Sequence, residues 1–138
     1  MKVNSVNNVN FRSLKGLSDP DNRMIFENLS NKYGKDFVKM AQNAFQEISD
    51  VSGDEDVFIR FKTTDCVQNS GLTSRTDLAI TDTEGREIAR ELIDFPNSSF
   101  TLFGIGEHFK NLTRSFRDFF IPNTSLNSEI DKTINKFA

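Results

Sequence analysis

The sequence has no tryptophan, one cysteine, one histidine and one tyrosine, and no long apolar run. The single Cys66 excludes a disulfide within the chain and is typical of a reducing compartment. The single His108 excludes a metal site built from several histidines. No stretch resembles a signal-peptide core or reaches the length of a membrane span, so we expect a cytoplasmic protein.

Nearly all aromatic residues of the chain are phenylalanine. Fourteen are Phe, and the only other one is Tyr33. A Phe ring fills space but cannot donate a hydrogen bond, so this usage indicates a large apolar surface, either a core or a docking face. Half of these residues lie in one C-terminal stretch: Phe95, Phe100, Phe103, Phe109, Phe116, Phe119 and Phe120.

The charge is unevenly distributed along the 138 residues, whose net charge is −3. Residues 51–95 contain 5 basic and 10 acidic side chains, which gives −5, whereas residues 1–50 and 96–138 carry +1 each. An acidic segment disfavours contact with phosphates, so we expect no DNA partner and interpret this stretch as a solvated acidic face.

The N-terminal residues 1–18 lack a sustained helix or strand period, and we expect a flexible arm there. The arm could instead dock as an extended strand through its spaced apolar residues, which are Val3, Val6, Val9 and Phe11. Residues 19–138 then form a single α+β domain of a size that needs neither metal nor disulfide.

Two helices open this domain. Asp19 suits an N-cap and Pro20 the first helical position, and Gly34 provides a stop. A second helix over 36–48 has a wide apolar face, so the pair forms a helical hairpin with a very short turn.

Alternation of apolar and polar residues predicts strands over 57–62 and around 78–80, with a polar loop at 65–76 between them. A turn at 82–85 follows. Residues 86–93 fit either a strand or a helix, and the preceding turn favours the strand.

A helix over 106–120 follows, and Pro122 is expected to end it before a last helix over 126–137. The predicted fold is therefore α+β: an N-terminal helical hairpin, a three-stranded antiparallel meander, and two C-terminal helices packed on one face.

No combination of residues forms a complete catalytic, metal or cofactor signature. Glu107 and His108 are adjacent, so on a helix their side chains diverge by about 100°. A dyad of Cys66 with His108 requires the fold to join distant segments. The acidic residues around Gly53 lack the spacing of a calcium loop. We therefore expect no catalytic residues, no metal and no cofactor.

The composition favours a protein-binding module of the adaptor, inhibitor or chaperone type, without catalytic activity. Phe119 and Phe120 are adjacent and cannot both face inward equally, so one is expected to remain exposed. The predicted partner-binding residues are Phe103, Arg117, Phe119 and Phe120. Two alternatives remain open: a small enzyme using His108 with Cys66 or an acidic residue, and a membrane-surface or RNA-binding protein. The latter would use the basic face of helix 106–120, formed by Lys110, Arg114 and Arg117.

Overall fold

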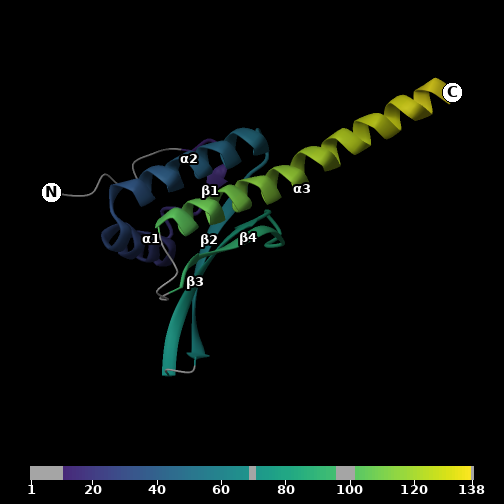
Figure 1. Ribbon diagram of the computed structural model, residues 1–138. Coiled ribbons are helices and arrows are strands. Elements are labelled where there is room, and N and C mark those ends of the chain that lie inside the picture. The colour runs from purple at the N-terminus through teal and green to yellow at the C-terminus, as the bar shows by residue number, and fades with distance from the viewer. Residues whose placement is uncertain (1–10, 69–70, 96–101, 138) are drawn as a thin grey trace.

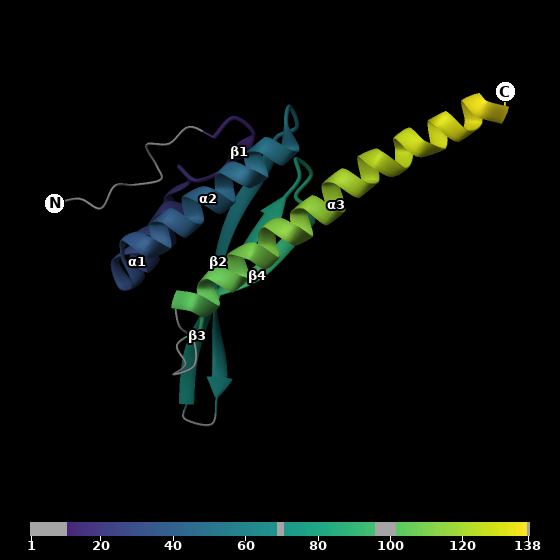
Figure 2. The ribbon, with the colours of Figure 1, turned by 45° about the horizontal axis from the view of Figure 1, so that its top comes forward.

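The computed structural model describes residues 11–68, 71–95 and 102–137. A mixed sheet of four strands, in the order β1-β2-β3-β4, has its helices on one face (Figures 1 and 2). The α+β class is therefore confirmed. The elements are β1 Leu14–Lys15, α1 Pro20–Tyr33, α2 Lys35–Ser52, β2 Val57–Gln68, β3 Gly71–Thr81, β4 Glu87–Asp94 and α3 Leu102–Phe137.

The N-terminal helical hairpin forms as its capping residues predict. The Asp19 carboxylate accepts a hydrogen bond from the Asp21 amide at 3.0 Å, and Pro20 is the first residue of α1. Gly34 is the one residue between α1 and α2, and it adopts a φ of 85°. This left-handed conformation lets the chain reverse within a single residue.

The β2–β3 hairpin is longer than predicted. Residues 65–76, expected to be a loop, are mostly paired, because the register continues from Phe58↔Thr81 to Gln68↔Gly71. The loop prediction was wrong because it relied on polarity. Thr63, Thr64 and Asp65 are exposed, so this part of β2 needs no apolar side, and its threonines favour extended backbone.

β4 settles the ambiguity over 86–93 in favour of the strand. It pairs antiparallel with β3, and Ala89 and Ile93 are buried beneath the helices. The turn before it is held by Asp82, whose carboxylate accepts hydrogen bonds from the amides of Glu84 and Arg86, each at 2.9 Å.

The predicted flexible arm is wrong for residues 11–18, and residues 1–10 lie outside the described residues. Phe11, Leu14 and Leu17 are buried, and Leu14 pairs with Val57 in a parallel β1–β2 ladder. A side chain at Gly16 would place its Cβ 2.9 Å from the Ile59 carbonyl oxygen, so this close approach needs glycine. The predicted meander β2-β3-β4 is present, but β1 makes the sheet four-stranded and mixed.

The two predicted C-terminal helices are one helix, α3, which begins at Leu102 and continues to Phe137. Pro122 does not end it. Proline removes one backbone donor from the helical ladder, and the helix continues on both sides of that missing bond. In Figures 1 and 2 the second part of α3 extends away from the sheet and the other helices. No helix in the described part of the chain is long and apolar enough to cross a membrane.

The core lies between the sheet and the helices and is built around phenylalanine. The Phe26 ring of α1 lies 5.7 Å from Phe37, 6.2 Å from Phe45 and 6.0 Å from Phe61, between ring centroids. Phe11 meets Phe45 edge-on at 6.1 Å. The segment before β1 therefore belongs to the same core as the helices.

Replacing Phe11 by alanine tests this placement. We expect Phe11→Ala to lower the free energy of unfolding in urea by about 3 kcal/mol, because it leaves a cavity against Phe45. Met24→Ala on the exposed side of α1 is the control and should change it by less than about 0.5 kcal/mol. Equal losses from the two variants would mean that residue 11 is not part of the core.

A polar cluster ties the end of α1 to the end of β4. The Tyr33 hydroxyl donates to the Asp94 carboxylate, and Lys32 Nζ lies 3.2 Å from both carboxylate oxygens. Burial raises the pKa of the Tyr33 hydroxyl above its ordinary value of 10.0, and the hydrogen bond and negative charge of Asp94 raise it further. The cluster is therefore most stable while Tyr33 is neutral.

The titration of Tyr33 can be followed alone, because the chain has no other tyrosine and no tryptophan. Absorbance at alkaline pH should show Tyr33 ionising above 10.0 in the folded protein, and Asp94→Asn should lower that midpoint. A raised folded pKa gives stability that is complete below the unfolded pKa and is lost as pH rises through the folded one. An Asp94→Asn midpoint equal to that of the unmodified protein would contradict the contact.

Candidate functional site

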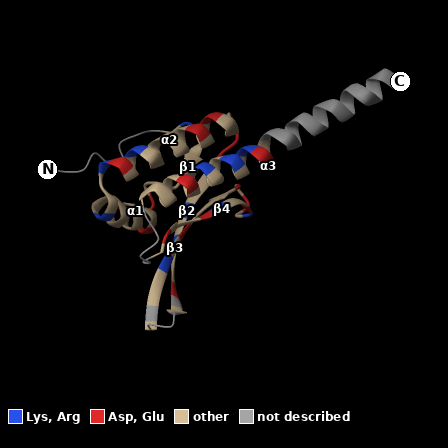
Figure 3. Cartoon of the chain, in the orientation of Figure 1, with Lys and Arg blue, Asp and Glu red and all other residues tan. Residues whose placement is uncertain are grey.

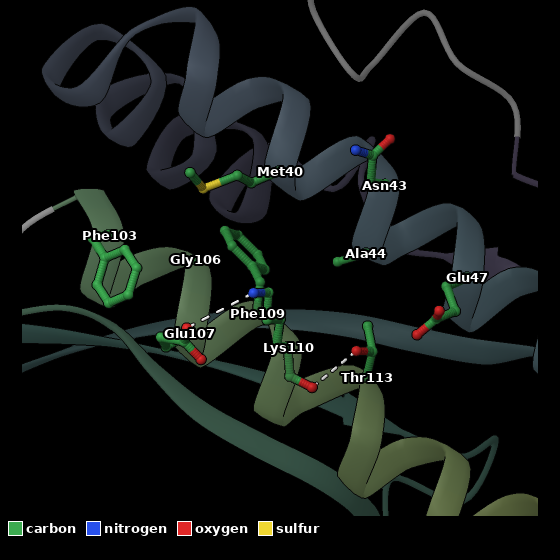
Figure 4. Close-up of a pocket in the computed structure, with 10 residues that line it drawn as sticks. All are labelled: Met40, Asn43, Ala44, Glu47, Phe103, Gly106, Glu107, Phe109, Lys110 and Thr113. Atoms are coloured by element: carbon green, nitrogen blue, oxygen red, sulfur yellow. Dashed lines mark hydrogen bonds and ion pairs between the residues drawn. The ribbon is translucent and has the colours of Figure 1, made fainter.

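A groove of about 350 Å³ lies between α2 and α3 (Figure 4). Four residues at helical spacing line it from α2: Met40, Asn43, Ala44 and Glu47. The α3 side supplies Phe103, Gly106, Glu107, Phe109, Lys110 and Thr113. One stripe of each helix therefore forms each wall.

The floor of the groove is apolar. Ala44 and Phe109 are buried, and the Phe109 ring packs against Phe37 at 5.7 Å. At Gly106 a Cβ would lie 3.5 Å from the Met40 sulfur, which is an ordinary van der Waals contact, so the absence of a side chain there leaves space at the floor. A groove with small residues at its floor can accept an apolar side chain from outside.

The rim carries charges of both signs and one large apolar ring. Phe103 is 76% exposed, and Figure 4 places it at one end of the groove, with Glu47 and Thr113 toward the other. Glu47 forms an ion pair with Arg117 at 2.9 Å, and Glu107 lies 3.8 Å from Lys110 Nζ. The charged rim is thus largely paired within the molecule, whereas the Phe103 ring is left to solvent.

The structure separates the four residues predicted to bind a partner. Phe103 lines the groove, and Arg117 reaches its rim through Glu47. Phe120 is half-buried and stacks on Phe116, with centroids 5.5 Å apart and planes at 15°. Phe119 is 51% exposed and does not line the groove. These positions do not test whether any of the four binds a partner.

Sequence reasoning missed the α2 wall of the groove. The wide apolar face of the helix predicted over 36–48 includes Met40 and Ala44, and its pattern does not show that part of this face forms the wall of a groove. Gly106 was interpreted as the first residue of a helix, although it lies inside α3. The small size of Ala44 and Gly106 was the available signal for space between helices, but their presence in one groove depends on the fold.

The histidine has an acidic partner that adjacency in sequence does not show. His108 Nδ1 lies 2.7 Å from a carboxylate oxygen of Glu91 on β4, and both side chains are half-buried. The carboxylate can orient the imidazole, as a base and its orienting acid require. Neither residue lines the α2–α3 groove.

The Cys66–His108 dyad is not assembled. Cys66 pairs with Thr73 on β3, whereas Glu91, the partner of His108, pairs with Leu78. Thr73 and Leu78 are about 16 Å apart along the strand. Cys66 thus belongs to the part of the hairpin that extends beyond β4 (Figure 1).

The proposed basic face of α3 is partly neutralised. Lys110 and Arg117 have the carboxylate partners described above, and Arg114 lies 3.5 Å from the Asn111 amide oxygen. A surface for phosphates needs net positive charge, so these pairs weaken the RNA and membrane alternatives at this face. Among the described residues, no group of three or more His, Cys, Asp or Glu is placed to hold a metal ion.

Comparison of the chain with family models, curated proteins and solved structures finds no match.

Two aromatic positions on α3 distinguish core from surface. Phe116 is fully buried, so Phe116→Ala should cost about 3–5 kcal/mol of unfolding free energy. Phe119→Ala, three residues away, should cost less than about 1 kcal/mol because its ring is already half in water. Urea melts of both variants measure the difference, and similar losses would refute the assignment of Phe119 to the surface.

Proposed function

We propose that this protein is a non-enzymatic protein-binding module whose α2–α3 groove takes the apolar face of a helix from a partner. The observation that carries the proposal is Phe103, a large apolar ring that is 76% exposed beside an apolar floor. Burial of such a ring by a partner contributes about 1.5–3 kcal/mol. Exposed aromatic residues next to a pocket are typical binding hot spots.

The shape of the groove supports a helical partner. On α2 the lining residues extend from Met40 to Glu47, and on α3 from Phe103 to Thr113. These stretches correspond to about 10 Å and 15 Å of helix. A partner helix lying along the groove would present side chains at i, i+3 and i+4, which is the spacing of helix-in-groove recognition.

The polar residues of the rim support specificity. Asn43 and Thr113 have side chains able to form hydrogen bonds at the edge of the contact. The Glu47–Arg117 pair lies at the rim, where it contributes little affinity but repels partners with the wrong charge. Affinity would therefore come from Phe103 and the floor, and selectivity from the rim.

Phe103→Ala tests the proposal. The variant should keep the unfolding free energy within about 0.5 kcal/mol, because the ring makes little contact in the free protein. A photo-crosslinking residue at position 103 would identify the partner in the native cells. Titration calorimetry with that purified partner should then show at least about tenfold weaker binding for Phe103→Ala.

Phe119→Ala is the matched control, since it removes the same side chain from an exposed position on the same helix outside the groove. It should bind the partner within about twofold of the unmodified protein. Equal affinity for Phe103→Ala and the unmodified protein, or equal loss in both variants, would overturn the assignment of the groove.

A further inference from the structure

The face of the sheet that points away from the helices has its own chemistry. On β2 the residues Val57, Ile59 and Phe61 are buried under the helices, whereas the alternate residues Arg60 and Lys62 are exposed. Successive side chains of a strand point to opposite faces, so Arg60 and Lys62 belong to the open face. This face lies on the other side of the sheet from α2 and α3 (Figures 1 and 2).

Strand register gathers four basic residues on this face. Arg60 of β2, Ala79 of β3 and Arg90 of β4 form one row across the sheet. Lys62 and Asp77 oppose each other in the next row, and Arg75 lies two residues from Asp77 on the same strand. The basic residues of the strands are blue in Figure 3.

Asp77 organises two of these cations. Its side chain is only 5% exposed, and Arg75 Nη2 lies 3.0 Å and 2.9 Å from its two carboxylate oxygens. Arg90 approaches the same carboxylate at 3.5 Å and also pairs with Glu87 at 3.0 Å. Both guanidinium groups are therefore held on the surface by a buried anion, which reduces their entropy loss on binding.

Arg60 and Lys62 form no ion pair with any residue in the part of the chain that the structure describes. These four cations and the two carboxylates that pair with them, Asp77 and Glu87, sum to +2, although the whole chain has −3. We name Arg60, Lys62, Arg75 and Arg90 the cationic sheet face. Its sign is opposite to that of the acidic segment from which it comes.

We propose that the cationic sheet face binds an acidic peptide segment of a partner protein in extended conformation. Arg60 and Lys62 are two residues apart on one strand, so their Cα atoms are about 6.6 Å apart. Carboxylates on alternate residues of an extended peptide have the same repeat, and each can pair with one cation. Arg75 and Arg90 extend the contact across the sheet.

The surroundings disfavour the other occupants. A second copy would bring the same cations against each other, which is repulsive. A long nucleic acid strand would meet the carboxylates of Asp19, Asp21 and Asp82, which together with Arg60 line a polar cavity of about 530 Å³. A short acidic peptide meets fewer of these carboxylates, because Lys62, Arg75 and Arg90 do not line the cavity.

The test uses fluorescence anisotropy with a labelled peptide of twelve residues that alternates glutamate and threonine. We expect saturable binding at low salt that weakens as salt rises, and no binding of the same peptide with glutamine in place of glutamate. Arg60→Gln with Lys62→Gln should weaken binding at least about tenfold. The control carries Arg23→Gln with Lys39→Gln, two exposed cations of α1 and α2, and should stay within about twofold.

Three results would overturn the inference. Equal weakening in both double variants would mean that only net charge matters. Tighter binding of a twelve-nucleotide single-stranded DNA or RNA than of the glutamate peptide would assign the face to nucleic acid. Loss of peptide binding in Phe103→Ala would place the peptide in the α2–α3 groove. The inference does not rest on the groove, so the two proposals fail separately.

Discussion

The contact of the Phe109 ring with Phe37 at 5.7 Å and Phe45 at 6.3 Å holds α3 against α2, and the other features of the site depend on it. It brings α3 across β4, which places His108 against Glu91. It also creates the groove, because Ala44 and Gly106 leave space where the helices approach. Phenylalanine suits this role since its ring packs on several neighbours and requires no hydrogen-bond partner in the core.

The same apolar layer explains why the two proposed surfaces differ in chemistry. The helices cover the apolar side of β2. The opposite side of that strand is exposed to water and carries Arg60 and Lys62. On the helical side, the inner stripe of α3 is buried, and Phe103 remains outside it. The α2–α3 groove and the cationic sheet face thus lie on opposite sides of the sheet, and the partner proposed for each differs in chemistry. A module with both could join two segments of one partner or two partners.

Charge counted along the sequence misrepresents charge on the surface. Residues 51–95 have 10 acidic side chains, but several lie in turns, as Asp54 and Asp82 do, and Asp77 is buried under two arginines. Residues two apart share a face of a strand, whereas residues in neighbouring strands meet only through the register. A count along the sequence therefore does not give the charge of either face of the sheet.

The sequence by itself determined the elements whose causes are local. Asp19 and Pro20 begin α1, Gly34 separates the first two helices, and alternation identifies the strand at 57–62, because capping and periodicity act within a few residues. Tertiary structure alone decided the docking of residues 11–17, the length of the β2–β3 hairpin and the continuation of α3 through Pro122. It also decided the pairing of His108 with Glu91 and the assembly of the groove and the cationic sheet face. These features depend on contacts between distant segments, where the free energy of burial and strand pairing outweighs local preference.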